Sequence, residues 1–115
     1  GKQIACIYQE NVGTPSKIAI LSSEGGSPLK IFPVLPQAIN TRWSVDGREI
    51  VYVSAETGVS NLWAQPIDGG KPRQITNFTS ERIFWFDISQ DGKQIAVSRG
   101  AVTGDVVLIK DFRRL

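Results

Sequence analysis

The residues of this chain that could do chemistry are few, and they form no recognisable catalytic set. Histidine is absent from the 115 residues, which removes the commonest general base, the commonest metal ligand and any Ser-His-Asp triad. The sequence has no G-x-S-x-G motif and no calcium loop, and its single cysteine, Cys6, excludes an internal disulfide. It therefore predicts a protein that is not an enzyme and that has no catalytic residue, cofactor or metal.

Several short motifs that could carry chemistry are better explained as turns and loops. Ser27 and Lys30 have S-x-x-K spacing, but the matching position of the next repeat carries K-P-R-Q, so we interpret the motif as a turn. Asn77 begins a glycosylation motif that we interpret as a loop. Each of three aspartates precedes a glycine, where a hydrogen bond to the local backbone explains it: Asp46, Asp68 and Asp91.

The elements that would position any site follow an internal repeat of 44 to 46 residues. Residues 39–53 and 83–97 each contain two alternating apolar runs joined by S-x-D-G, and residues 1–7 match the second half of this unit. A G-G-x-P-x-x-I motif recurs at residues 25–31 and 69–75. Several short strands repeated at this period are typical of the four-stranded blades of a β-propeller.

The predicted fold class is all-β, a partial β-propeller of about two and a half four-stranded antiparallel blades. One complete blade is flanked by two three-stranded blades, in a single domain over residues 1–115 that divides into 1–38, 39–76 and 83–110, with 77–82 as a loop. Ten strands are predicted, at residues 2–8, 17–22, 29–32, 39–44, 49–54, 61–66, 72–76, 83–88, 94–98 and 105–110.

The innermost strands of the second and third blades carry the most informative side chains. Alternation along them places Trp43, Phe84 and Phe86 on one side, and we predict that this side packs in the core. Arg42 and Asp87 occupy the same position of adjacent blades on the other side. We predict that they are bonded across the blade interface or reach the central channel.

Any recognition is expected on the face where the longer connections lie, because rigid scaffolds usually place binding residues on variable loops. These connections are residues 10–16, 33–37, 55–60, 77–82 and 100–104. At this face and at the mouth of the channel, the candidate interaction residues are Asn40, Arg42, Arg82 and Trp85.

Charge and hydropathy exclude two classes of partner. The net charge is +2 and is spread along the chain, without the basic block that a nucleic-acid site requires. The longest apolar runs, such as residues 106–109, are far shorter than the ~20 residues of a membrane helix, and no signal peptide opens the sequence. We expect no nucleic acid and no membrane contact by this chain.

The unit W-S-x-D-G-[KR]-x-I, followed about twenty residues later by G-G-x-P-x-x-I, resembles the TolB-like branch of the WD-repeat-like β-propellers. That family usually has W-S-P-D-G, whereas Val45 and Gln90 replace the proline here and Ile88 replaces the second tryptophan. The last repeat, residues 91–113, also resembles the C-terminal end of bacterial receptor-like serine/threonine kinases, whose sensor region is such a propeller.

These resemblances imply a non-catalytic module for protein interaction or ligand sensing, part of a larger bacterial protein such as a receptor-like kinase. Two alternatives stay open: the gating propeller of a prolyl-oligopeptidase-like serine peptidase, and a TolB-like periplasmic envelope protein. An extracytoplasmic or periplasmic location is implied. Because a blade is covered only by its neighbours, we also expect self-association through the open blade edges, with two copies closing a ring around a two-fold axis.

Overall fold

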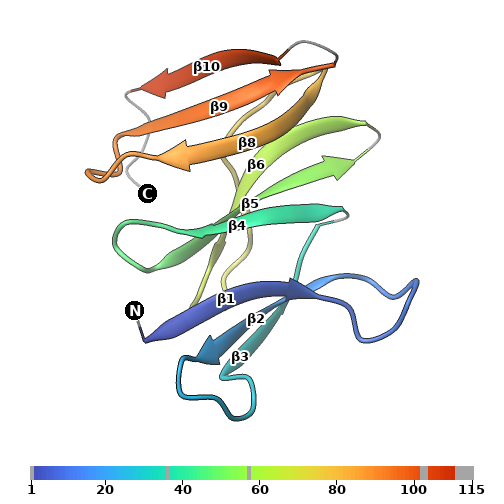
Figure 1. The fold of residues 1–115 in the computed structure, drawn as a ribbon, viewed down its shortest axis with the longest axis vertical. Helices are drawn as coiled ribbons and strands as arrows, with labels where there is room; N and C mark the ends of the chain where they lie inside the picture. The colour runs from blue at the N-terminus through green and yellow to red at the C-terminus, as the bar shows by residue number, and fades with distance from the viewer. Residues whose placement is uncertain (1, 36, 57, 102–103, 111–115) are drawn as a thin grey trace.

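The computed structural model describes residues 2–35, 37–56, 58–101 and 104–110 of the chain (Figure 1). These residues form ten β-strands and no helix. The described part of the chain therefore contains no helix that could cross a membrane. The strands are β1 (Gln3–Tyr8), β2 (Lys17–Ser22), β3 (Lys30–Pro33), β4 (Ala38–Trp43), β5 (Glu49–Glu56), β6 (Val59–Pro66), β7 (Arg73–Gln74), β8 (Arg82–Ile88), β9 (Gln94–Gly100) and β10 (Gly104–Lys110).

The strands form three antiparallel sheets in which consecutive strands are neighbours. The N-terminal sheet has the order β1-β2-β3, the middle sheet β4-β5-β6-β7 and the C-terminal sheet β10-β9-β8. Figure 1 shows the middle sheet lying between the other two. The predicted all-β partial propeller, with one four-stranded sheet between two three-stranded sheets, is therefore confirmed.

The two-sided core is clearest along β5, in the middle sheet. Ile50 and Tyr52 belong to the apolar cluster shared with the N-terminal sheet, whereas Val51 and Val53 belong to the cluster shared with the C-terminal sheet. All four side chains are 0% exposed, because successive residues of a strand point to opposite faces and both faces are covered. Burying each contributes roughly 1.5–3 kcal/mol, so β5 stabilises both interfaces of the middle sheet.

The S-x-D-G turns form as their side-chain chemistry predicts. Ser44 Oγ donates to Asp46 Oδ1 at 2.7 Å and accepts from Glu49 N at 3.0 Å, and Gly47 takes a φ of +72°. The hydrogen bond from Ser44 Oγ, with a second from Arg48 N, holds the pKa of Asp46 below its ordinary value. The turn at residues 89–92 repeats the same bonds.

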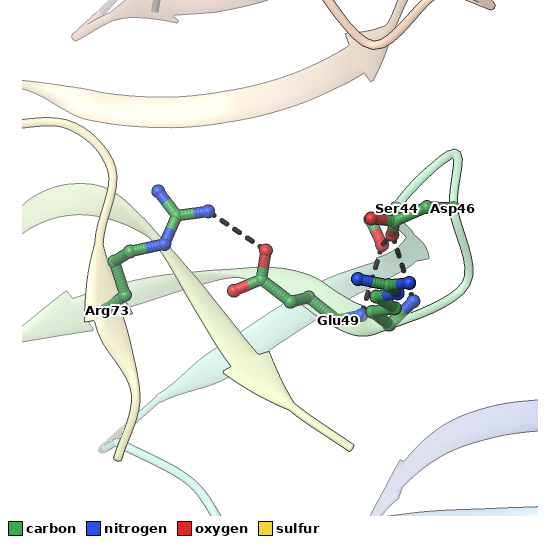
Figure 2. A network of polar contacts seen from close by, with 5 residues as sticks. Ser44, Asp46, Glu49 and Arg73 are labelled. Atoms are coloured by element: carbon green, nitrogen blue, oxygen red, sulfur yellow. Dashed lines mark hydrogen bonds and ion pairs between the residues drawn. The ribbon is translucent and has the colours of Figure 1, made fainter. Parts of the chain in front are cut away.

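Glu49 connects this turn to the far side of the middle sheet (Figure 2). Its backbone N–H donates to Ser44, and its carboxylate Oε1 accepts a hydrogen bond from Arg73 of β7 at 2.9 Å. The two side chains are 19% and 29% exposed, so water screens this ion pair less than a fully exposed one. The short strand β7 is thereby held to the middle sheet by a charge pair as well as by its backbone.

The prediction that residues 55–60 form a long connection is wrong, because the connection is much shorter. β5 continues to Glu56 and β6 begins at Val59, and these two residues pair with each other. Gly58, with a φ of +82°, lies in the turn, as the tight turns of β-hairpins require. The segment is a tight hairpin and not a variable loop.

The prediction that Phe84 lies in the core is also wrong. The pairing of each innermost strand is irregular, within residues 39–42 of β4 and within residues 83–85 of β8. An extra residue in one strand reverses the alternation beyond it. Phe86 is 1% exposed as predicted and Trp43 packs against the core, whereas Phe84 is 46% exposed.

The two G-G-x-P motifs are not structurally equivalent residue by residue. The turn before β3 is one residue longer than the turn before β7. Lys30 therefore takes the position on β2 that Arg73 takes on β6. The spacing of 44 residues had instead matched Arg73 with Leu29. As a result, Phe32 enters the core at 8% exposure, while Ile31 is 48% exposed.

Candidate interaction site

Arg42 of β4 contacts three consecutive residues of β8 across the interface between the middle and C-terminal sheets. Its Nε donates to the Phe86 carbonyl at 3.3 Å and lies 4.0 Å from Asp87 Oδ1. Its Cζ lies 4.7 Å from the centroid of the Trp85 ring. The prediction that Arg42 and Asp87 are bonded across this interface is confirmed, and Arg42 also makes a cation–π contact with Trp85.

The electrostatic part of this contact is weak. The Arg42 and Asp87 side chains are 35% and 69% exposed, and at 4.0 Å the pair is at the limit of an ion pair. Exposed pairs of this kind contribute about 0.2–1 kcal/mol. The arrangement therefore orients the Arg42 guanidinium more than it stabilises the stack.

The four candidate residues are only partly brought together. Arg42 meets Trp85, whose ring is 52% exposed. Asn40 lies at the irregularity of β4 with a φ of +57° and is half-buried. Arg82 is exposed at the first residue of β8 and, among the described residues, no hydrogen bond or ion pair links it to Arg42 or Trp85.

On the face of the long connections, side chains from two of them line a groove with a volume of about 340 Å³. The connections supply Leu35, Phe78 and Thr79, and the strands of the middle sheet supply Ser54, Val59, Asn61, Trp63 and Gln74. Residues 36, 57, 102 and 103 of the predicted recognition face lie outside the described residues. Within the described ranges, no three His, Cys, Asp or Glu side chains gather closely enough to hold a metal ion.

The polar groups beside this groove are largely bonded to one another. Asn61 donates to the Phe78 carbonyl at 3.1 Å and accepts from Thr76 Oγ1 at 2.8 Å and from Phe78 N at 2.7 Å. Arg99 lies 3.6 Å from the Phe78 ring centroid and donates to the Ser80 carbonyl at 2.8 Å. This network fixes the connection from β7 to β8, and no sequence motif had indicated it.

The outer face of the N-terminal sheet, which points away from the middle sheet, is apolar. Ile4, Leu29 and Ile31 are 50%, 54% and 48% exposed. The strand register places Cys6, Ala19 and Leu21 beside them, and Tyr8, Lys17 and Pro33 at one end of the same face. The inner face of the same sheet is covered by the middle sheet through Ile18, Ile20 and Phe32.

Two further grooves lie between β1 and β4. One, of about 480 Å³, is lined by residues 5–7 of β1 and residues 38–41 of β4, which include Asn40. The other, of about 400 Å³, is lined by Lys2, Gln3, Trp43 and Gly47. The sequence indicated these grooves only indirectly, because the first blade was predicted to lack its innermost strand.

Comparison with known proteins adds a second line of evidence. No protein-family model matches the chain. The Tol-Pal system protein TolB of Thioalkalivibrio sulfidiphilus is 33% identical over 61 residues, which are 53% of this chain and 14% of that protein. The chain is similar to TolB. The TolB protein of Hamiltonella defensa is 30% identical over 77 residues, which are 66% of this chain and 18% of that protein. The TolB protein of Pseudomonas aeruginosa is 36% identical over 55 residues, which are 48% of this chain and 13% of that protein.

The chain thus matches less than one fifth of the length of each TolB protein. Weak homology to TolB over about half the chain and three stacked antiparallel sheets are together consistent with a fragment of a propeller. The resemblance to receptor-like kinases stays a prediction, and residues 111–113 of the segment that carries it lie outside the described residues.

Proposed function

We propose that the chain is a non-catalytic protein-interaction module, part of a TolB-like propeller of the Tol-Pal envelope type in a larger bacterial protein. The observation that carries this proposal is the exposed apolar outer face of the N-terminal sheet. In the repeat, Ile4 and Cys6 of that face correspond to Ile50 and Tyr52, which are buried against the N-terminal sheet. The outer face therefore has the composition of a sheet-to-sheet interface, and such faces mark interaction sites.

For the 115-residue chain on its own, a second copy is the partner that we propose for this outer face. Three sheets are close to half of the six-bladed ring that the TolB resemblance implies, so two copies related by a two-fold axis could close a ring. Light scattering should give the mass of a dimer at high concentration for the unchanged chain and of a monomer for Ile31→Lys.

The control for this test is Val12→Lys, because Val12 is 102% exposed in the connection between β1 and β2 and lies outside the apolar outer face. This variant should dimerise like the unchanged chain. A well-folded monomer of the unchanged chain at high concentration would contradict self-association through the outer face.

We also propose that the module works in the periplasm. The similarity to TolB supports this role over those of a kinase sensor or a peptidase propeller. The flanking coding sequence discriminates among the three: a signal peptide without a catalytic domain is expected for an envelope protein. An upstream kinase with a membrane helix, or a downstream G-x-S-x-G domain, would contradict the proposal.

A further inference from the structure

The groove on the face of the long connections, with its volume of about 340 Å³, is formed by internal segments of the chain. Residues of β5, β6 and β7 contribute to it, together with the connections that follow β3 and β7. Its lining runs from Leu35 to Thr79 and includes no described residue of β1 or β10, the first and last strands. Every wall of the groove is therefore supplied by the described chain itself.

The strand register places an aromatic ring and an amide side by side in this groove. Trp63 of β6 pairs with Gln74 of β7 on one edge and with Tyr52 of β5 on the other. Cross-strand partners point to the same face of a sheet with Cβ atoms about 5 Å apart, so the Trp63 and Gln74 side chains are neighbours. Trp63 also packs against the apolar cluster that contains Tyr52, which is 0% exposed. The core therefore holds the tryptophan ring in place.

Trp63 and Gln74 leave one hydrogen-bond donor and one acceptor available at the groove. Within the described ranges no residue accepts a hydrogen bond from Trp63 Nε1, and the one buried side-chain nitrogen or oxygen without a partner is Arg99 Nε. The indole N–H is therefore open to water or to a ligand. Gln74 is exposed, and its Nε2 donates to the Thr76 carbonyl at 2.7 Å, which leaves its Oε1 as an acceptor. The groove thus presents an N–H group beside a C=O group.

The rest of the lining is uncharged. Leu35, Val59 and Phe78 supply apolar surface, and the exposed residue Thr79 supplies a hydroxyl group. No described Asp, Glu, Lys or Arg side chain lines the groove, so a charged ligand would lose water without gaining an opposite charge. The volume lies at the lower end of the range for small-molecule sites, which is roughly 300–1,000 Å³. These properties select a small uncharged ligand.

We propose that this groove binds an uncharged sugar ring that carries an N-acetyl group. The N–H of the acetamido group donates to Gln74 Oε1, and its C=O accepts from Trp63 Nε1. Its methyl group packs on the apolar surface of Leu35 and Val59, and Thr79 bonds a hydroxyl group of the ring. The inference goes beyond the proposed protein-interaction role, because it adds a small-molecule site that uses neither the apolar outer face nor a second copy.

A sugar suits this groove better than a peptide segment does. Extended peptides are commonly bound through main-chain hydrogen bonds to an open strand edge. Both edges of β5 and of β6 are paired, and β7 has two residues only. The groove therefore offers side-chain groups and very little free strand backbone. The ring of Trp63, which is apolar on its face and polar at its N–H, suits the C–H and polar groups of a sugar.

Titration with N-acetylglucosamine, followed by NMR on the complete 115-residue chain, tests the site directly. The chain has three tryptophans, whose indole N–H signals can be assigned from single Trp→Phe variants. We expect a saturable shift of the Trp63 indole signal at millimolar concentrations of the sugar, and none of the Trp43 and Trp85 signals. The amide signal of Phe78, which lines the groove, measures the affinity in every variant.

Two related sugars separate the N-acetyl group from the ring. Glucose has a hydroxyl group in place of the acetamido group, and glucosamine has an ammonium group there at pH 6. Both should bind at least about tenfold more weakly than N-acetylglucosamine. Each lacks the carbonyl that accepts from Trp63 and the methyl group that packs in the groove, and glucosamine also carries a charge.

Two substitutions with matched controls test the donor and the acceptor. Trp63→Phe keeps an aromatic ring and removes the N–H, and Trp43→Phe makes the same change in a residue that packs against the same cluster. Gln74→Ala removes the acceptor, and Gln90→Ala makes the same change at an exposed position in the turn before β9. Trp63→Phe and Gln74→Ala should each lower the affinity about threefold to tenfold, whereas the controls should change it less than twofold.

The inference would be overturned by the absence of a saturable shift, or by a shift of the Trp43 or Trp85 signal in place of the Trp63 signal. Glucose or glucosamine binding as tightly as N-acetylglucosamine would overturn it, as would equal affinities for the groove variants and their controls. Equally tight binding of N-acetylglycine N-methylamide would assign the groove to a peptide segment and overturn it too. Ile31→Lys should bind the sugar like the unchanged chain, so this inference and self-association can each fail without the other.

Discussion

Arg42 lies over the ring of Trp85, with its Cζ 4.7 Å from the ring centroid, and so connects the innermost strands of two adjacent sheets. The same guanidinium donates to the Phe86 carbonyl and pairs loosely with Asp87. Trp85 nevertheless stays 52% exposed, so about half of its surface remains accessible to a partner. Arg42 is therefore both a connection between sheets and a candidate recognition residue.

Exchanging the charges of Arg42 and Asp87 should be milder than removing either one. The double variant Arg42→Asp with Asp87→Arg keeps an opposite pair across the interface, whereas Arg42→Ala loses it; both variants lose the hydrogen bond to Phe86 and the cation–π contact with Trp85. We expect Arg42→Ala to lower the free energy of unfolding by about 1–2 kcal/mol, and the double variant by about 0.2–1 kcal/mol less than Arg42→Ala. Urea denaturation measures both values.

The variants Arg42→Asp and Asp87→Arg complete the double-mutant cycle for this pair. Each places two like charges near each other, so each should be less stable than the double variant. If the three variants lose equal stability, the two side chains do not interact and Arg42 acts only through Trp85 and Phe86.

The sequence predicted the strands well because their signals are local. S-x-D-G turns and alternating apolar runs depend on neighbouring residues, and Ser44 and Asp46 bond as their side chains allow. The repeat then placed Arg42 opposite Asp87, because equivalent positions in adjacent blades face each other. The predicted number of strands in each sheet followed from the same repeat.

Features that depend on one residue of register could not be read from the sequence. The irregular pairing of β8 turns Phe84 outward, and nothing in the alternating pattern signals it. The longer turn before β3 likewise moves Phe32 into the core in place of Ile31. The Glu49–Arg73 pair was missed because the two residues are 24 positions apart and come close only once β5, β6 and β7 have paired.

The two S-x-D-G turns should respond unequally to the same substitution. Ser44 is 3% exposed and Ser89 is half-buried, although their hydroxyl groups make equivalent hydrogen bonds. Ser44→Ala leaves the part-buried amide of Glu49 without its acceptor and should cost about 1–2 kcal/mol, whereas Ser89→Ala leaves the exposed amide of Gln94 and should cost about 0.5–1 kcal/mol. Thermal denaturation followed by circular dichroism compares the variants, and equal losses would contradict the role of burial.

The lowered pKa of Asp46 predicts a pH-dependent part of the stability. The hydrogen bonds from Ser44 Oγ and Arg48 N favour the carboxylate, so the folded chain binds this proton less readily than the unfolded chain, whose pKa is near 3.8. The stabilisation is present above pH 3.8 and is lost as the pH falls through the lower folded pKa.

Asp46→Asn is the variant that tests this pH dependence, because it removes the charge and keeps the shape of the side chain. It should be less stable than the unchanged chain at pH 7, and urea denaturation should show this gap closing as the pH approaches 2. A gap that persists at low pH would mean that lost hydrogen bonding, and not the charge, accounts for the difference.

The register of β3 can be tested by truncating two adjacent side chains. Phe32 is 8% exposed and belongs to the cluster between the N-terminal and middle sheets, whereas Ile31 is 48% exposed on the outer face. Phe32→Ala should lower the free energy of unfolding by about 3–5 kcal/mol, and Ile31→Ala by less than about 1 kcal/mol. Urea denaturation at low protein concentration avoids any contribution from self-association, and a larger loss for Ile31→Ala would restore the register predicted from the G-G-x-P spacing.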